Sequence, residues 1–218
     1  MGTGQSNVDA DSSRTPNRWG EGERLRQEIL DAAERLLDTI DRPEDLSLRA
    51  IAREAGVSAP AIYLHFAGKA ELMWCLLDSV YASLARTIRT AHAAAPPTDP
   101  WSGLRAAVDA YCQFATVARH RYDLVFRIAP VIPSERQPGN SPLQQVLDAW
   151  CDVIRPCLKA QDHPRVRVGE AGKLLWSGLH GQIGLWWNIS DDPGHREFER
   201  LRESLLRVIF EPLERPTD

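Results

Sequence analysis

The sequence predicts an all-α protein, in which an amino-terminal three-helix domain of the helix-turn-helix type precedes a larger helical domain, with about nine helices in total. Apolar residues recur along most of the chain with the period of a buried helix face, and no stretch of useful length alternates as a strand would. Near the amino end, a glycine separates two short capped segments, which is typical of two helices joined by a tight turn.

Four segments are expected along the 218 residues, which suffice to bury a substantial core. Residues 1–20 are polar and rich in turn-forming types, which predicts a disordered arm. Residues 21–67 would form the helix-turn-helix domain and residues 68–94 a single connector helix. Residues 95–218 would form a second domain of further helices.

The first helix is expected from Arg24 to Thr39, where seven apolar side chains follow the helical period: Leu25, Ile29, Ala32, Ala33, Leu36, Leu37 and Ile40. This stripe would cover the back of the helix-turn-helix. A turn is expected at Asp41–Asp45, which contains a proline and three acidic residues.

The next helix presents one apolar face, formed by Leu48, Ile51, Ala52 and Ala55. Ser47 precedes this face and can cap the helix by accepting a backbone N–H. Gly56 follows it and can end the helix, because glycine adopts the left-handed conformation without steric cost.

A second short helix is expected directly after this turn, with Ser58 as its cap. Val57 and Ile62 are spaced to form a hydrophobic staple across that cap. Pro60 lacks an N–H, so that Ala61 would have to donate to the Ser58 side chain instead.

The connector helix, from Gly68 to about Ala94, is apolar nearly all round, which predicts that it is buried between two bodies. Its apolar residues fall on two sides: Leu72, Leu76, Val80 and Leu84 on one, and Trp74, Leu77, Tyr81 and Ile88 on the other. Later helices are expected at Trp101–Arg119, Tyr122–Ile128, Pro142–Ala160, Arg165–Asn188 and from His195 to about Phe210, with a loop at Ala129–Ser141.

The composition argues against a membrane-spanning or secreted protein. There is no apolar run of about 18 residues and no apolar block in the first twenty residues, so neither a membrane span nor a secretory signal is expected, and the predicted location is cytoplasmic. Cys75, Cys112, Cys151 and Cys157 lack metal-site spacing and are interpreted as small buried side chains, with a redox-sensing pair at Cys151 and Cys157 as the alternative.

The residues from Ser47 to Lys69 closely resemble the DNA-binding segment of TetR-type (TetR/AcrR) transcriptional regulators. The resemblance rests on the helix Leu48–Ala55, the turn Gly56-Val57-Ser58, the run Ile62–Phe66, and Lys69. It implies that the second helix enters the major groove, with the chain as a homodimer on double-stranded DNA. It also implies phosphate contacts from Tyr63, His65 and Lys69, a base or phosphate contact from Arg49, and a reading tip at Ala59, Pro60 and Ala61. The full set of expected DNA-binding residues is Ser47, Arg49, Ser58, Ala59, Pro60, Ala61, Tyr63, Leu64, His65 and Lys69.

The net charge of −4 is unlike that of many DNA-binding proteins, so the charge must be patterned locally. Arg49, Arg53 and Lys69 would face DNA, and the arm residues Arg14 and Arg18 could reach it, although a solvated arm is the favoured interpretation. The acidic residues of the first helix would lie on its far side: Glu28, Asp31, Glu34 and Asp38. Binding should therefore depend strongly on salt.

Four glycines, at positions 172, 178, 181 and 184, fall inside one predicted helix, where each costs about 1 kcal/mol relative to alanine. Close approach of another helix or a ligand would offset this cost. We expect the last two helices to pair with their copies in a second subunit, through Gly178, Gly181, Trp186, Leu201, Leu205 and Val208. The Trp-x-x-x-His-Gly pattern at Trp176–Gly181 also resembles a class of TetR carboxy-terminal domain named after these three residues.

Seven residues are candidates for a ligand pocket in residues 95–218: Trp101, Tyr111, Phe114, Phe126, Trp150, Trp176 and His180. Simple core is the favoured interpretation of the aromatic residues. His180 is interpreted as a histidine hydrogen-bonded within a packed helix, since no second ligand stands nearby for a metal. Neither cofactor nor metal is expected.

The function expected from the motif and the resemblance is that of a transcriptional regulator, a repressor released from a palindromic operator by a small apolar or aromatic effector. The alternatives are a DNA-binding regulator without an effector and, with little support, a helical enzyme or ligand carrier, because the sequence lacks nucleophile-elbow, phosphate-loop and metal motifs. Effector, operator, regulated genes and the sign of regulation are not set by the sequence.

Overall fold

A computed structural model describes residues 21–40, 45–117, 119–124, 142–162, 164–189 and 195–210. Within these residues the secondary structure is entirely helical, which confirms the predicted fold class. The helices are α1 (Glu21–Leu37), α2 (Leu48–Glu54), α3 (Ala59–Ile62), α4 (Lys69–Ala93), α5 (Pro100–Val117), α6 (Arg119–Asp123), α7 (Pro142–Lys159), α8 (Val168–Ile189) and α9 (His195–Phe210). None of these helices is both long enough and apolar enough to span a bilayer.

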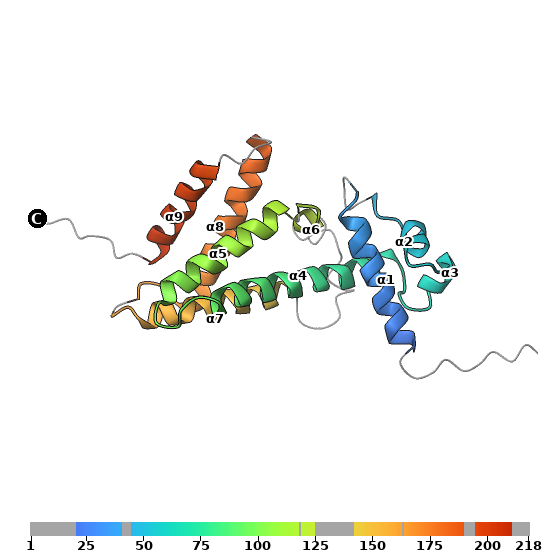
Figure 1. The fold of residues 1–218 in the computed structure, drawn as a ribbon, viewed down its shortest axis with the longest axis horizontal. Coiled ribbons are helices and arrows are strands. Elements are labelled where there is room, and N and C mark those ends of the chain that lie inside the picture. Colours follow the sequence, from blue (N-terminus) through green and yellow to red (C-terminus); the bar gives the residue numbers. More distant parts are fainter. Residues whose placement is uncertain are drawn as a thin grey trace, which may run out of the picture.

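Helices α1, α2 and α3 gather at one end of the molecule, and α4 leads from them into the larger helical body (Figure 1). In that body α4 packs mainly against α5 and α7, α8 packs on α7, and α9 packs on α8. Both predicted apolar sides of α4 are buried, including Leu76 and Val80 on one side and Trp74 and Tyr81 on the other. The connector helix is therefore shared by the cores of both parts.

Helix bounds differ from the predicted ones where side chains stabilise an end. Helix α1 begins at Glu21, and the acidic residues Glu21 and Glu23 of its first turn interact favourably with the helix dipole. Helix α8 begins at Val168 rather than Arg165, because the Glu170 carboxylate accepts the backbone N–H of Arg167 at 3.2 Å. Helix α6 (Arg119–Asp123) begins three residues before the predicted start at Tyr122, and the predicted end at Ile128 lies outside the described residues.

Several expectations lie outside the described residues. These are the amino-terminal arm with Arg14 and Arg18, most of the turn at Asp41–Asp45, the loop at Ala129–Ser141, and the pocket candidate Phe126.

Candidate nucleic-acid interface and regulatory core

The turn between α2 and α3 forms as the sequence predicts. The Ser47 hydroxyl accepts the backbone N–H of Ala50 at 3.2 Å and so caps α2. At the other end Gly56 has φ of +69°, its N–H donates to the Arg53 carbonyl, and the next N–H donates to the Ala52 carbonyl. This pair of bonds is the Schellman arrangement, which needs a residue that tolerates the left-handed conformation.

Helix α3 is shorter than a reading helix of the expected kind and holds a single α-helical turn. The Ser58 side chain makes no capping bond, so that part of the prediction is wrong. The Ala61 N–H instead donates to the backbone carbonyl of Ser58 at 2.9 Å. Beyond Ile62 the chain continues through tighter turns, in which Tyr63, Leu64 and His65 each bond to the carbonyl three residues back.

The outer surface of α2, α3 and the following turn carries most of the expected DNA-binding side chains. Tyr63 is 59% exposed and Leu64 is 83% exposed, although both side chains are large and partly or wholly apolar. The other exposed members are Ser47, Arg49, Ser58, Pro60 and Lys69, while Ala59, Ala61 and His65 are half-buried. Exposed large apolar groups beside cations, on a rigid turn, are suited to contacting another molecule.

This surface is held from beneath by the core of the amino-terminal part. Ile62 and Phe66, which alternate with the exposed residues of α3 and its turn, are buried. The Arg26 guanidinium of α1 lies 4.7 Å from the centre of the Phe66 ring, a cation–π contact. A hydrogen bond of 2.9 Å from Arg35 Nε to Glu54 Oε1 ties α1 to the end of α2. The exposed side chains of this surface are therefore attached to a packed core.

Two of the four acidic residues expected on the far side of α1 contact α6. Arg121 of α6 donates from Nε and Nη2 to the two carboxylate oxygens of Asp38, at 2.9 and 2.7 Å. Its Nη1 lies 3.6 Å from Glu34, whose other oxygen accepts the Ser79 hydroxyl of α4 at 2.5 Å. This Arg121 fork, the set of contacts from one guanidinium to Asp38 and Glu34, joins the amino-terminal helices to the carboxy-terminal body. The hydrogen bonds to Asp38 raise the pKa of Arg121.

The neighbouring residue on α6 faces the opposite way, into the carboxy-terminal core. Tyr122 is buried and its hydroxyl hydrogen-bonds to Nδ1 of His180 on α8. The Tyr122 ring meets the Tyr111 ring of α5 edge-on, with centroids 6.4 Å apart, and the Tyr111 hydroxyl accepts the Trp176 indole N–H at 3.2 Å. Trp150 of α7 closes this aromatic cluster against Tyr111 at 5.7 Å.

The sequence missed Arg121 and Tyr122 because each gains its role from partners distant in the chain: 83 residues for Arg121 and 58 for Tyr122. The one local signal was a cation adjacent to a tyrosine on a short helix. The expectation for His180 as a hydrogen-bonded histidine of a packed helix is confirmed, and burial lowers its pKa to about 4. No group of metal-binding side chains occurs in the described part of the chain.

The structure brings together four of the seven pocket candidates: Tyr111, Trp150, Trp176 and His180. The Trp150 indole N–H is fully buried, and no described residue accepts it. An unmade hydrogen bond of this kind costs about 1–3 kcal/mol, so the donor is a candidate contact for a ligand acceptor. Phe114 packs on the rim of the core, whereas Trp101 lies elsewhere, between α5 and α9.

The four glycines of α8 separate into two kinds. A Cβ atom on Gly178 would lie 2.7 Å from Leu205 of α9, and one on Gly172 would contact Trp150 and Cys151 at 3.6 Å. The close approach at these two positions is therefore within the chain, and Gly178 and Leu205, both predicted for a subunit interface, contact each other. A Cβ atom on Gly181 or Gly184 would have no heavy atom of the described residues within 4 Å.

Exposed apolar residues lie on the same face of α8 as Gly181. Leu174 and Leu185 lie on the same side of α8, seven residues before and four after Gly181, and Leu185 is 65% exposed. On α9, Leu201 and Val208 are exposed. Trp186, on α8, is half-buried, and its indole N–H lacks an acceptor among the described residues. The sequence had not singled out Leu174 and Leu185.

The four cysteines are free thiols, with Cys112 and Cys157 buried and Cys75 and Cys151 half-buried. Burial raises the pKa of Cys112 and of Cys157 to about 12, which suppresses the reactive thiolate. The buried interpretation is confirmed for Cys112 and Cys157.

Two family models match the chain. Residues 29–73 match the model described as bacterial regulatory proteins, tetR family, and residues 104–209 match the tetracyclin repressor-like C-terminal domain. The first match contains the α2–α3 surface and both acidic partners of Arg121, and the second contains Arg121 and the aromatic cluster.

Among characterised proteins, the chain is 33% identical over 121 residues to the HTH-type transcriptional activator FasR of Mycolicibacterium smegmatis, a match that covers 54% of this chain and 52% of that protein. The chain thus spans about half the length of this relative.

Similar solved structures include a protein of unknown function from Rhodococcus sp. RHA1 (TM-score 0.69, 23% identity, 90% and 100% of the two chains). A tetR-family regulator from Streptomyces coelicolor gives a TM-score of 0.65 at 21% identity over 85% and 80% of the two chains. The fatty acid degradation regulator FadR from Bacillus halodurans gives 0.65 at 16% identity over 87% and 97%. At these identities the structures establish the common fold.

Proposed function

Since this chain belongs to the TetR family of bacterial regulatory proteins and is a DNA-binding transcription regulator, we propose that it acts as a homodimer that a small apolar or aromatic effector releases from a palindromic operator. The observation that carries this proposal is the α2–α3 surface, where Tyr63 and Leu64 are exposed beside Arg49 and Lys69 on a buried base. In a two-fold dimer, two such surfaces about 34–36 Å apart would fit successive major grooves.

The dimer contact is proposed at the exposed apolar face of α8 and α9. Leu174, Gly181 and Leu185 on α8 and Leu201 and Val208 on α9 offer this face, and Gly181 leaves room for close approach of a partner helix. Apolar residues exposed together on two adjacent helices are typical of an interface. Gly178 and Leu205 would support the face from within the subunit.

The effector is proposed to act at the aromatic cluster, where the Trp150 N–H has no acceptor among the described residues. A ligand there would shift Tyr122 or His180, and α6 would pass the shift through Arg121 to Asp38 at the end of α1. Coupling of about 1–3 kcal/mol is usual for such linkage, enough for 5- to 150-fold release from DNA.

Binding to operator variants tests the DNA-reading role. Fluorescence anisotropy with the DNA upstream of the protein's own gene, at stated salt, should show tight binding. Arg49→Ala should lose discrimination between single-base variants of the site, as expected for a residue that contacts a guanine. Arg86→Ala, an exposed cation of α4, is the matched control. If Arg49→Ala weakens all sequences equally, Arg49 contacts only phosphate.

Activation is the second candidate, because the relative that is 33% identical over half of its length is named as a transcriptional activator. A promoter–reporter fusion measured with and without the protein separates the two. Expression that rises when the regulator is deleted indicates repression, and expression that falls indicates activation.

A further inference from the structure

The turn after α3 carries the most exposed large apolar side chain in the described part of the chain, Leu64, which is 83% exposed. Its N–H donates to the Ala61 carbonyl at 3.2 Å, and in a turn of this kind residues three apart lie on one side. Ala61 is half-buried, and Pro60 beside it is exposed. Pro60, Ala61 and Leu64 therefore form one small apolar surface, which we call the α3 patch.

The α3 patch is poor in hydrogen-bonding groups. Its three side chains are apolar, and Pro60 has no backbone N–H. The Ala61 N–H donates to the Ser58 carbonyl at 2.9 Å, and the Leu64 N–H is used within the turn. The carbonyls of Pro60 and Ala61 accept the N–H groups of Tyr63 and Leu64, each at 3.2 Å. The patch can therefore contact a base by apolar packing, but it offers no donor to the edge of a base.

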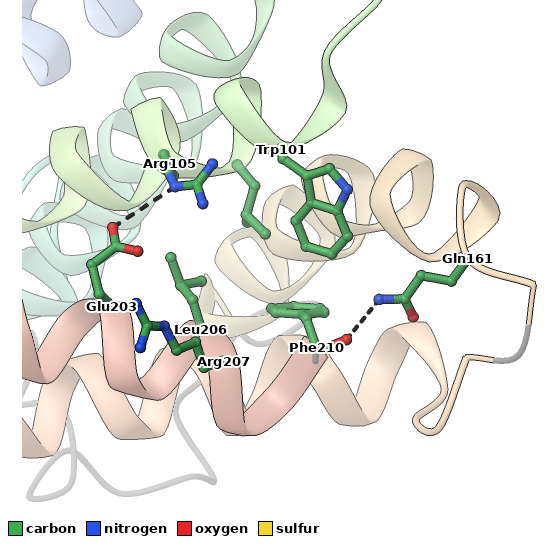
Figure 2. Close-up of a pocket in the computed structure, with 8 residues that line it drawn as sticks. Trp101, Arg105, Gln161, Glu203, Leu206, Arg207 and Phe210 are labelled. Carbon is green, nitrogen blue, oxygen red and sulfur yellow. Dashed lines mark hydrogen bonds and ion pairs between the residues drawn. The ribbon is translucent and has the colours of Figure 1, made fainter. Parts of the chain in front are cut away.

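Apolar and charged side chains also meet in the cleft between α5 and α9, but there they contact each other. Figure 2 shows the Trp101 ring beside that of Phe210 and the Arg105 side chain directed at Glu203. The two ring centroids are 5.6 Å apart, and Arg105 and Glu203 form an ion pair at 3.8 Å. Leu64 is covered by no such neighbour, because most of its surface is exposed. It is therefore available for contact with another molecule.

The major groove of DNA presents one apolar group, the C5-methyl of thymine. Adenine, guanine and cytosine present donors and acceptors there, and a donor or acceptor that loses water without gaining a partner weakens binding. An apolar surface without hydrogen-bond donors thus fits the thymine methyl better than it fits the edge of any other base.

We propose that the α3 patch reads thymine in the operator, with Leu64 as a specificity-determining residue that contacts a C5-methyl group. This inference rests on the proposed DNA-reading function and adds to it the class of base that is recognised. Arg49, proposed to contact a guanine, would supply the hydrogen-bonded part of the readout. Each half-site would then combine a guanine with at least one thymine.

Exchange of thymine for deoxyuridine tests this proposal, because the two bases differ only in the C5-methyl group. The full chain first selects a site from a library of random duplexes. Fluorescence anisotropy then compares the selected duplex with duplexes that carry deoxyuridine at one thymine at a time. We expect binding to be about fourfold weaker at one or more positions, as for the loss of one buried methyl-sized group.

Two failures of this experiment have different meanings. Equal binding of thymine and deoxyuridine at every position would overturn this inference and leave the proposed function intact. A chain that selects no sequence from the library would overturn both.

Two variants assign the methyl contact. Leu64→Ala should bring the thymine-to-deoxyuridine affinity ratio to about one at the sensitive position, and circular dichroism should show an unchanged fold, since the side chain is exposed. If this variant binds weakly, the ratio is measured at lower salt, where phosphate contacts strengthen binding. Val117→Ala trims a side chain that is 79% exposed at the end of α5 and, as the matched control, should keep the fourfold ratio. A fourfold ratio that persists in Leu64→Ala would assign the methyl contact to another residue and overturn the proposal.

Discussion

Tyr63 and Tyr111 are the same residue type in opposite settings. Tyr63 at the α3 turn is 59% exposed, and its neighbour Leu64 is more exposed still. Tyr111 in the carboxy-terminal body is fully buried, and its hydroxyl accepts the Trp176 N–H. The same residue type therefore lies at the surface at one of these positions and in the core at the other. Only the exposed tyrosine is available to another molecule.

The polar groups of the two regions also differ in their exposure. At the amino-terminal end the cations Arg49 and Lys69 stay at the surface, where DNA phosphates can reach them. In the aromatic cluster Tyr122, His180 and Trp176 form hydrogen bonds within the chain, and the Trp150 N–H has no acceptor among the described residues. The proposed DNA-binding surface is therefore identified by exposure, and the proposed effector site by an unsatisfied hydrogen-bond donor.

Paired truncations should separate the two regions most strongly. Trp150→Ala is expected to lower the free energy of unfolding by about 3–5 kcal/mol, because it empties a fully buried site. Tyr63→Ala should change it by less than about 0.5 kcal/mol, since little of that side chain is packed. Urea denaturation followed by circular dichroism measures both. Equal losses would show that Tyr63 is structural.

Operator affinity should show the reverse order. Tyr63→Phe removes only the hydroxyl proposed to bind a phosphate, and we expect about a tenfold loss of affinity with unchanged stability. Fluorescence anisotropy at two salt concentrations measures this loss, and the salt dependence should stay unchanged, because the hydroxyl is uncharged and neutralises no phosphate. An affinity equal to that of the unaltered chain would remove Tyr63 from the interface.

The link between the two regions should have a smaller effect on stability. Asp38→Asn keeps the shape of the side chain but weakens the ion pair with Arg121. The free energy of unfolding is expected to fall by about 1 kcal/mol, because the pair is partly exposed. Arg121→Gln and the double variant complete a cycle. Independent effects of the two changes would mean that the pair does not act as a unit.

At neutral pH the smallest effect is that of His180, because its contribution changes only when the solution is made acidic. Burial lowers the pKa of His180 from 6.5 to about 4, so the unfolded chain binds a proton at this site before the folded chain does. Stability should therefore rise as the pH increases from about 4 to 6.5 and gain nothing further from this group above 6.5. His180→Asn should flatten that part of a plot of Tm against pH. A slope identical to that of the unaltered protein would assign it to other groups.

Local features of the fold were predictable from sequence, since they depend on residues a few positions apart. The Ser47 cap, the Gly56 turn and the buried faces of α4 are of this kind. The short span of α3 was not predictable, because the buried residues Ile62 and Phe66 are spaced as they would be on a longer helix.

The residues of the candidate sites were likewise predictable only where local sequence determines them. Exposure of Tyr63 and Leu64 agrees with the motif, while their DNA contacts stay a prediction. The Arg121 fork and the Gly178–Leu205 contact required knowledge of which helices meet, which periodicity alone does not give. Trp101 was grouped with the aromatic cluster because residue type was the only available criterion, and the structure places it in a different cleft.

The Arg121–Asp38 fork has a consequence for protein engineering. Its acidic half lies in residues 29–73 and its basic half in residues 104–209, two modules that are attractive to exchange between regulators. A hybrid that joins residues 29–73 to the carboxy-terminal domain of another regulator would contain Asp38 and Glu34 without the Arg121 guanidinium that they contact here. Such hybrids should signal best when an arginine equivalent to Arg121 is transplanted along with the graft.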